Sequence, residues 1–253
     1  MSPKKHSSII EFYNVEAPYV TEFRRLLHNI STNDVNKELK TIMMTSAMLS
    51  EGKSTVCSFL AITAAVKKGK KTLLIDSDLR RPTIHKIFQL QAKAGLKEIL
   101  ADGYNTRDAI STTEIDKLDV LTAGGFCENP SQVFDADAMG VLLEELKFYY
   151  DLIIIDAAPL LPVSDPMLLA SKVDGVLMVV KAGATQKEVV RRAVEILNPR
   201  QNNLIGIAFN NMNHSLPYYY DYGYYQYEYD MDRKKGKKLP PTQNKELHKR
   251  KAK

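Results

Sequence analysis

The stretch Thr41-Ile-Met-Met-Thr-Ser-Ala-Met-Leu-Ser-Glu-Gly-Lys-Ser54 joins a short apolar run to the sequence Gly-Lys-Ser. It fits the phosphate-binding loop pattern if Ala47 is allowed at the first glycine position. The apolar run before the loop predicts a strand and the segment after it predicts a helix, which is the setting that the pattern requires. The stretch therefore predicts an α/β protein with a phosphate-binding site at the end of a strand.

Apolar, β-rich runs alternate with helical segments from about Lys40 to Asn210. Most of these runs lack alternation of apolar and polar residues, as is typical of strands covered on both faces. The order of the runs predicts a mostly parallel β-sheet flanked by helices on both faces. The expected strands are Thr41–Thr45, Thr72–Ile75, Leu118–Leu121, Leu152–Ile155, Gly175–Val180 and Leu204–Phe209, and the expected helices are Ala17–Ile30, Lys53–Lys68, Asp137–Tyr150, Asp165–Ser171 and Gln186–Leu197.

The length of 253 residues suits one α/β domain with appendages, and a hydrophobic content of 44% is ordinary for a chain with a buried core. We expect residues 1–39 to form an N-terminal arm and helix, and residues 40–213 to form the nucleotide-binding domain. Apolar periodicity ends there, so residues 214–253 are predicted to form a flexible, disordered tail.

Charge is distributed unevenly along the chain. The net charge is +5, but residues 233–253 hold ten of the 35 Lys and Arg residues and one of the 30 acidic residues. The rest of the chain therefore carries 25 basic and 29 acidic groups. A basic end of this kind fits contact with anionic lipid, nucleic acid or an acidic partner, and it fits a solvated disordered end equally well.

Three features that the sequence lacks indicate the cellular compartment of the protein. No apolar run approaches the ~18–20 residues that span a bilayer, and no apolar signal segment follows the first residues. The two cysteines, Cys57 and Cys127, lie outside any Cys-x-x-Cys spacing and predict neither a disulfide framework nor a metal site. These observations predict a cytoplasmic protein.

Carboxylates follow two further predicted strands. Asp76 and Asp78 come at the end of the run that starts at Leu73, and Asp156 comes directly after Ile153-Ile-Ile. Ligands bind outside the carboxyl ends of the strands in open α/β sheets, so we expect these side chains to meet the loop in one crevice. An Asp at the end of a strand can also cap the next turn. That interpretation fits any one of these residues better than it fits all three beside such a loop.

The loop offers the donors that a nucleoside triphosphate with Mg²⁺ requires. Its backbone N–H groups would surround a phosphate at the start of a helix. Lys53 would reach the β- and γ-phosphates, and the hydroxyl of Ser54 would bind Mg²⁺. The sequence thus predicts ATP and Mg²⁺ as cofactors. The predicted nucleotide-binding residues of the loop are Ser50, Glu51, Gly52, Lys53, Ser54 and Thr55.

Eight of the 13 tyrosines lie within one short segment before the basic end. Without a nucleotide site, such a run would be interpreted as an interaction motif or an edge-pairing strand. Beside an ATP site, phosphate acceptors are the better explanation, and each phosphate would add about −1.5 to −2 charges. The predicted phosphoacceptors are Tyr218, Tyr219, Tyr220, Tyr222, Tyr224, Tyr225, Tyr227 and Tyr229.

Together, these motifs resemble those of the bacterial tyrosine kinases (BY-kinases) that act with capsular and exopolysaccharide assembly machinery. In that family they are called Walker A, Walker A′ and Walker B, and a C-terminal tyrosine cluster follows them. The resemblance covers roughly residues 20–229. Asn129-Pro130-Ser131 and the segment from Gly206 to Asn210 are also similar to family segments, although less specifically.

The resemblance implies an ATP-dependent tyrosine autokinase whose domain, residues 40–213, has the P-loop fold of the MinD and ParA ATPases. It implies that Asp76 helps to deprotonate the incoming tyrosine, which is useful because a phenol of pKa ~10 is a poor nucleophile. The roles of Asp76 and Asp78 could be exchanged. Asn210 is implied to contact the adenine. The implied metal-binding residues are Ser54, Asp78 and Asp156, and the implied catalytic residues are Lys53, Asp76, Asp78 and Asp156.

Family members form rings in which the tyrosine tail of one subunit enters the site of its neighbour. The nearest match to the interface motif Glu-x-x-Arg-x-x-Arg runs from Glu22 through Arg25 to His28, so the final Arg is replaced. Residues 1–39 are therefore a possible oligomer interface, and they fit an ordinary helix packed on the domain about as well.

The resemblance also implies partners and a cellular role. The implied partners are a membrane-anchored activator that regulates polysaccharide chain length, copies of the chain itself, and a cognate tyrosine phosphatase, and no nucleic acid is expected. The activator would recruit the cytoplasmic kinase to the inner face of the cell membrane. Phosphorylation of the tail in trans would regulate polymerisation and export of capsular polysaccharide or exopolysaccharide.

Two departures from the family pattern concern the site. Ser50 replaces a glycine, so nucleotide affinity would suffer if that position needs a positive φ. Ala157-Ala158-Pro159 replaces a usual Thr-Pro-Pro, which removes one hydroxyl near Walker B. No charged catalytic group is deleted, and we expect activity to be retained.

Two other functions fit part of the sequence. A regulatory adaptor that binds ATP without transferring phosphate would agree with Ser50, His28 and the Ala157-Ala158 pair. A positioning ATPase of the MinD/ParA type would agree with the fold, but Met48 stands where those proteins have a signature lysine. The intact charged residues and the tyrosine run favour the kinase.

Overall fold

In the computed structural model, the strand expected before the loop forms as β1 and lies inside a seven-stranded sheet. The structure describes residues 8–32, 39–91, 93–135, 137–197 and 204–211, all within one compact unit, Met1–Asn211. Across these residues the strand order is β3-β4-β2-β5-β1-β6-β7, and every neighbouring pair is parallel except β3 with β4. The strands are β1 (Thr41–Ser46), β2 (Thr72–Asp76), β3 (Ser111–Thr112), β4 (Leu118–Leu121), β5 (Leu152–Asp156), β6 (Gly175–Lys181) and β7 (Leu204–Asn210).

The predicted mostly parallel sheet is confirmed, and each of the six expected strands forms within one residue of its expected ends. The sequence does not predict β3, because a strand of two residues is too short to show any periodicity. It pairs antiparallel with β4 at the edge of the sheet. Because β3 lies at the edge, the order of the central strands that position the site is the same with or without it.

The long helices also form where the sequence predicts them. Lys53–Lys68 has the predicted bounds, while the helix expected over Asp137–Tyr150 is shorter, because it ends at Leu146. The helices missed from the sequence have seven residues or fewer. The helices are α1 (Ile9–Phe12), α2 (Pro18–Thr32), α3 (Lys53–Lys68), α4 (Ile84–Ile87), α5 (Leu96–Asp102), α6 (Thr106–Ala109), α7 (Pro130–Asp135), α8 (Ala138–Leu146), α9 (Asp165–Ala170) and α10 (Lys187–Leu197).

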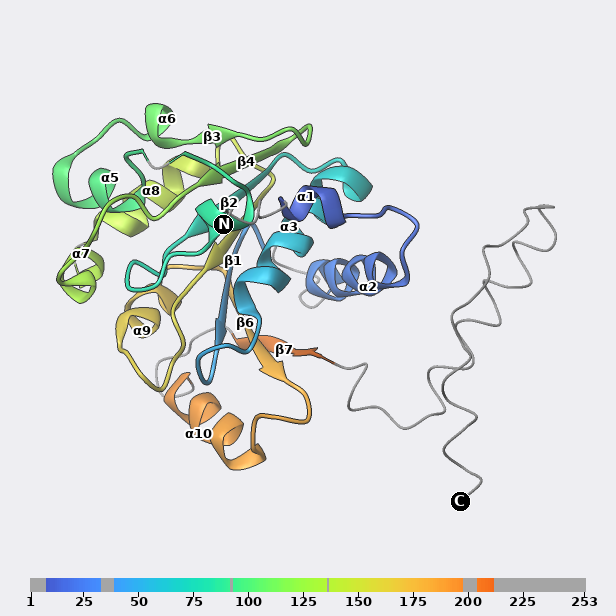
Figure 1. Cartoon of the computed structure of the whole chain (residues 1–253). Helices are drawn as coiled ribbons and strands as arrows, with labels where there is room; N and C mark the ends of the chain where they lie inside the picture. Colours follow the sequence, from blue (N-terminus) through green and yellow to red (C-terminus); the bar gives the residue numbers. More distant parts are fainter. Residues whose placement is uncertain (1–7, 33–38, 92, 136, 198–203, 212–253) are drawn as a thin grey trace, which may run out of the picture. The chain divides into compact units, whose positions relative to one another are not determined.

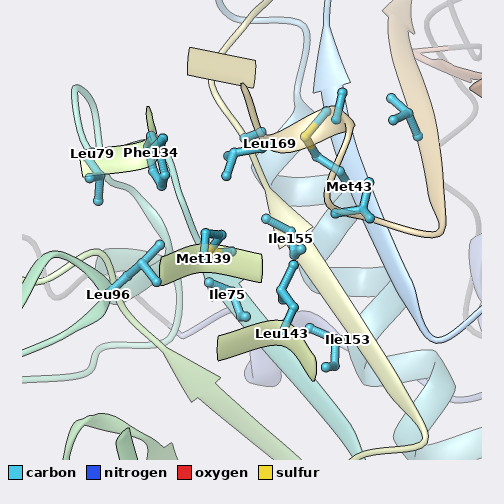
Figure 2. Close-up of a cluster of buried hydrophobic side chains, with 14 of the residues drawn as sticks. Met43, Ile75, Leu79, Leu96, Phe134, Met139, Leu143, Ile153, Ile155 and Leu169 are labelled. Carbon is cyan, nitrogen blue, oxygen red and sulfur yellow. The ribbon is translucent and has the colours of Figure 1, made fainter. Parts of the chain in front are cut away.

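Successive residues of the central strands contribute to two separate hydrophobic clusters. Met43 and Ile155 belong to one cluster, whereas Met44 and Ile154 belong to the other, because side chains alternate across a strand. Helices α5–α10 contribute to the first cluster, part of which is shown in Figure 2, and α1–α4 contribute to the second (Figure 1). The predicted cover on both faces is confirmed, and it explains the continuous apolar runs in the sequence.

The N-terminal helices pack against α3. The ring of Phe59 on α3 lies 5.2 Å from the ring of Tyr19 and 5.7 Å from that of Phe23, centroid to centroid. The hydroxyl of Tyr13 donates to Thr63 Oγ1 at 3.1 Å. One face of α2 is therefore covered by the domain itself. Among the described helices, none combines the length and the apolar composition that a bilayer crossing requires.

Asp174, which directly precedes β6, connects the start of that strand to the start of β1 through hydrogen bonds. Its Oδ2 atom accepts hydrogen bonds from the Thr41 N–H and the Thr41 hydroxyl, both at 2.9 Å, and from the Lys40 N–H at 3.1 Å. Partial burial raises the pKa of Asp174, but the hydrogen bonds from Thr41 and the charge of Lys147 outweigh burial, so the pKa is lowered. The ionised carboxylate thus stabilises the fold.

We expect the Asp174→Ala variant to lose about 2 kcal/mol of unfolding free energy at pH 7, since hydrogen bonds to a charged group are broken. Because the folded-state pKa is lowered, this contribution is present above the unfolded pKa of ~3.9 and is lost as pH falls through the lower folded value. Urea unfolding at pH 7 and pH 3 measures it, with Asp116→Ala on an exposed turn as the control. An equal deficit at both pH values would contradict the assignment.

Candidate active site

The loop after β1 contains two residues with a left-handed backbone. Gly52 has φ 83°, a conformation that favours glycine, and a Cβ atom there would lie 2.1 Å from Asn210 Nδ2, so the Asn210 side chain would have to shift. Ser50 has φ 62°, a conformation that costs a non-glycine residue about 1–3 kcal/mol. The replacement of glycine at this position, noted in the sequence, therefore has a structural consequence.

Helix α3 begins at Lys53, directly after the loop. The first N–H groups of any helix lack acceptors within the helix, and their partial positive charge favours an anion. The helix ends at Lys68 and is capped by Gly69, whose φ of 63° allows its N–H to donate to Ala65 O at 3.1 Å. The buried apolar face of α3 fixes its axis, so its N-terminus stays beside the ends of β2 and β5.

Lys53 is buried between carboxylates. Its Nζ lies 2.8 Å from Asp156 Oδ1 and 3.8 Å from Asp78 Oδ2. Burial lowers the pKa of Lys53, but the neighbouring Asp156 charge outweighs burial and the pKa is raised, so the ammonium is protonated at neutral pH. Burial raises the pKa of Asp156, and Lys53 opposes that shift. Asp156 Oδ2 is buried without a hydrogen-bond partner in the described part of the chain.

Asp76 lies beside Asp156, because β2 and β5 pair in parallel with these two residues in register. It is fully buried, and its Oδ2 atom accepts from the N–H groups of Thr83 and Ile84, each at 3.0 Å. Burial and then the charge of Asp156 raise the pKa of Asp76 to about 7. Asp76 thus caps the following turn, as the alternative interpretation of the sequence holds, and also exchanges a proton near neutral pH.

The structure brings together the residues that the sequence assigned to catalysis and metal binding, Lys53, Ser54, Asp76, Asp78 and Asp156. Asn210 lies at the other side of the loop, where its Nδ2 donates to Glu51 O at 2.9 Å. The eight tyrosines of the predicted phosphoacceptor segment lie outside the described residues. No group of three or more His, Cys, Asp or Glu in the described ranges forms a metal cage by itself. Mg²⁺ commonly uses only one or two carboxylates together with phosphate oxygens and water.

Sequence reasoning missed Asp165, which anchors the segment that carries Asp78. Arg80 donates to Asp165 through Nε at 2.6 Å and through Nη2 at 3.2 Å. The hydroxyl of Ser131, at the start of α7, donates to the same carboxylate at 2.6 Å. Both of these Arg80 nitrogens therefore bind the Asp165 carboxylate.

The Asp165→Asn variant is expected to lose about 1.5–3 kcal/mol of unfolding free energy, because its hydrogen bonds are charge-assisted and Asp165 is 2% exposed. For the tyrosine kinase activity that the resemblance implies, we also expect a rate about tenfold lower, because Asp78 is then held less firmly. Urea unfolding and phosphate incorporation measure the two effects. The control is Asp102→Asn, whose ion pair with Lys97 lies at the protein surface, where such pairs contribute little to stability. If Asp165→Asn and Asp102→Asn had the same free energy of unfolding, Asp165 would not anchor the segment as assigned.

The parallel sheet, the loop at the end of β1 and the buried Lys–Asp group define a P-loop nucleotide-binding protein. The AAA domain family matches residues 39–204 of this chain. The tyrosine-protein kinase YwqD of Bacillus subtilis is 36% identical over 202 residues, covering 79% of this chain and 85% of YwqD. The putative tyrosine-protein kinase CapB of Staphylococcus aureus is 34% identical over 224 residues, covering 86% of this chain and 98% of CapB.

Solved structures agree with these relatives. The kinase domain of the Escherichia coli tyrosine kinase ETK superposes with a TM-score of 0.76 at 30% identity, covering 83% of this chain and 82% of that domain. The cell division ATPase MinD of Pyrococcus furiosus shares the fold at a TM-score of 0.61 and 23% identity. The chain belongs to the bacterial tyrosine kinase family. The predicted P-loop fold and the predicted enzyme class, a protein-tyrosine kinase, are confirmed.

Proposed function

We propose that this chain transfers the γ-phosphoryl group of ATP to tyrosines between Tyr218 and Tyr229 of another copy of itself. The observation that carries the proposal is the buried group formed by Lys53, Asp78 and Asp156 at the end of the loop, with an unpartnered oxygen on Asp156. The site is adjacent to a loop and a helix N-terminus suited to phosphate. The acceptor segment is assigned from the sequence.

Ser54, Asp78 and Asp156 are the residues that would hold Mg²⁺. Hydroxyl and carboxylate oxygens are the ligands that this ion prefers, and the buried, unpartnered Asp156 Oδ2 is an oxygen that a cation would satisfy. When bound, Mg²⁺ supplies positive charge at the β- and γ-phosphate oxygens, where charge accumulates during transfer.

The residues of the chain have three tasks in this reaction. The loop N–H groups and Lys53 bind and neutralise the phosphates. Asp76 accepts the phenol proton, for which a pKa of about 7 is suitable. The phenol oxygen then forms a bond to the γ-phosphorus while the bond from that phosphorus to the β,γ-bridging oxygen breaks, and ADP leaves.

Asp76 and Asp78 differ in how easily an incoming phenol can reach them, which matters for the choice of the base. Asp76 is fully buried and Asp78 is 6% exposed, so the segment between Ser77 and Thr83 has to move before a phenol reaches Asp76. Exchange of the two roles requires less movement. The pKa of Asp76 supports its assignment as the base, and phosphorylation rates of Asp76→Asn and Asp78→Asn across pH 6–9 distinguish the two assignments.

The test is the intact mass of the protein after incubation with Mg-ATP, in the presence of the cytoplasmic segment of the activator. Mass steps of one phosphate that map to the segment from Tyr218 to Tyr229 would support the kinase. ATP binding without any mass change would instead support the regulatory adaptor. ATP turnover without phosphotyrosine would support the positioning ATPase.

Membership of the family supports a proposal for the cellular context. We propose that a membrane-anchored activator recruits the cytoplasmic kinase to the inner face of the membrane, and that a cognate phosphatase reverses its phosphorylation. The cycle would regulate polymerisation and export of capsular polysaccharide or exopolysaccharide. Glu22, Arg25 and His28 are exposed on α2, and we propose that this face of the helix contacts another copy in a ring.

A further inference from the structure

Glu51 lies between the two left-handed residues of the loop, and its carboxylate is buried, with 3% of the residue exposed. Its Oε2 atom accepts the Met48 N–H at 2.7 Å, across the loop. Its Oε1 atom accepts the Lys181 N–H at 3.3 Å and the hydroxyl of Thr185. Both oxygens are therefore occupied by protein donors.

Lys181 and Thr185, the residues that bind Glu51 Oε1, are themselves held in place by the fold. Lys181 is the last residue of β6, and its carbonyl accepts the Thr185 N–H at 3.0 Å and the Ala184 N–H at 3.2 Å. Helix α10 starts two residues after Thr185 and buries Ala193 and Leu197 in the core. Glu51 thus links the loop to a turn that is fixed at both ends.

The outer side of the loop has less support, namely a hydrogen bond from the Ser46 hydroxyl to the Met48 carbonyl at 2.8 Å. Met48 and Leu49 are each 43% exposed, so apolar packing does not hold this part of the loop. A non-glycine residue with a positive φ persists only where its surroundings impose that conformation. If Ser50 relaxed to a negative φ, its own N–H and that of Glu51 would change direction. These are two of the groups predicted to bind phosphate.

We propose that Glu51 is a positioning residue for phosphate binding, which acts through Thr185 and the backbone N–H groups of Met48 and Lys181 to hold Ser50 in its left-handed conformation. This inference rests on the proposed function, in which the loop binds the phosphates of ATP. It assigns to the Glu51 side chain a role that does not require contact with the nucleotide.

The test measures ATP affinity by calorimetry for the parent, Glu51→Ala and Thr185→Val, each with and without Ser50→Gly. We expect Glu51→Ala to weaken binding about tenfold and Thr185→Val about threefold to tenfold, because charge-assisted hydrogen bonds are lost. Ser50→Gly should restore most of the affinity in both backgrounds, since glycine adopts a positive φ without support. At saturating ATP, Thr185→Val should keep kcat within about threefold of the parent, so that the loss appears in KM.

The matched controls are Glu195→Ala and Thr112→Val, which change the same residue types at exposed positions. Unchanged affinity in both Glu51→Ala and Thr185→Val would overturn the inference. So would a loss of affinity that Ser50→Gly does not restore, because Glu51 would then act by another route. If Glu51→Ala does not fold, Thr185→Val with and without Ser50→Gly carries the test. A folded parent that does not bind ATP would overturn the proposed function itself.

Discussion

The Lys53→Met variant should incorporate no detectable phosphate from Mg-ATP, whereas the parent gains mass in steps of one phosphate. Lys53 is a buried cation 2.8 Å from Asp156, and methionine has similar length but no charge. Loss of one charged donor to the transferring phosphoryl group commonly costs about 10²–10³ in rate. The variant also leaves Asp78 and Asp156 without the cation that they share. The site is then one charge more negative, which disfavours binding of the anionic nucleotide.

Intact mass spectrometry measures this result, with the activator's cytoplasmic segment present in every sample. Lys68→Met is the control, because Lys68 lies at the exposed end of the same helix. Thermal unfolding shows whether Lys53→Met is folded at the assay temperature. Mixing folded Lys53→Met with the parent then tests transfer in trans, since the inactive copy should gain phosphate. Phosphorylation of Lys53→Met alone within tenfold of the parent rate would contradict the assigned site.

Replacement of all eight tyrosines from Tyr218 to Tyr229 by phenylalanine should abolish phosphate incorporation while ATP affinity stays within about twofold of the parent. Phenylalanine lacks the hydroxyl that forms the new bond to phosphorus, but it preserves the aromatic ring. The nucleotide residues all lie before Asn211 and are unchanged. Intact mass and calorimetry on the same preparation measure the two quantities.

The five other tyrosines provide the control. Tyr13, Tyr19, Tyr149 and Tyr150 each use the phenol oxygen in a hydrogen bond within the protein, and Tyr104 is 44% exposed. Tyr104→Phe should therefore leave the mass gain of the parent unchanged. If the variant without the eight tyrosines still gained phosphate at the parent level, the acceptors would lie elsewhere in the fold.

The sequence predicted the parts of the site that follow from strand order. Asp76 and Asp156 meet because each ends a strand, and parallel neighbouring strands end at the same edge of a sheet. Long apolar runs indicated these strands because both faces of the sheet are covered. The position of Lys53 follows from the loop pattern and its setting between strand and helix.

The rest of the site could not be predicted because it depends on contacts between residues far apart in the chain. Glu51 has the composition expected of a polar loop residue, and nothing in its neighbours identifies Thr185 as its partner. Asp165 could be placed near the start of a helix, but its pairing with Arg80 requires the geometry of two separate elements. Likewise, Asn210 was assigned to the adenine, and its hydrogen bond to Glu51 O is one that no local pattern indicates.

The central place of β1 has a consequence for synthesis of the chain. β1 pairs with β5 and β6, yet it ends at Ser46 while β5 begins at Leu152 and β6 at Gly175. A ribosome adding about 5–20 residues per second needs roughly 5–20 s to complete the first of these partners. During that interval six residues destined for full burial have no sheet to join, so the nascent chain is most exposed to aggregation then. Lys181 and Thr185, which bind the Glu51 carboxylate, are translated later still. A bound nucleotide can therefore stabilise the chain only after these residues have been made.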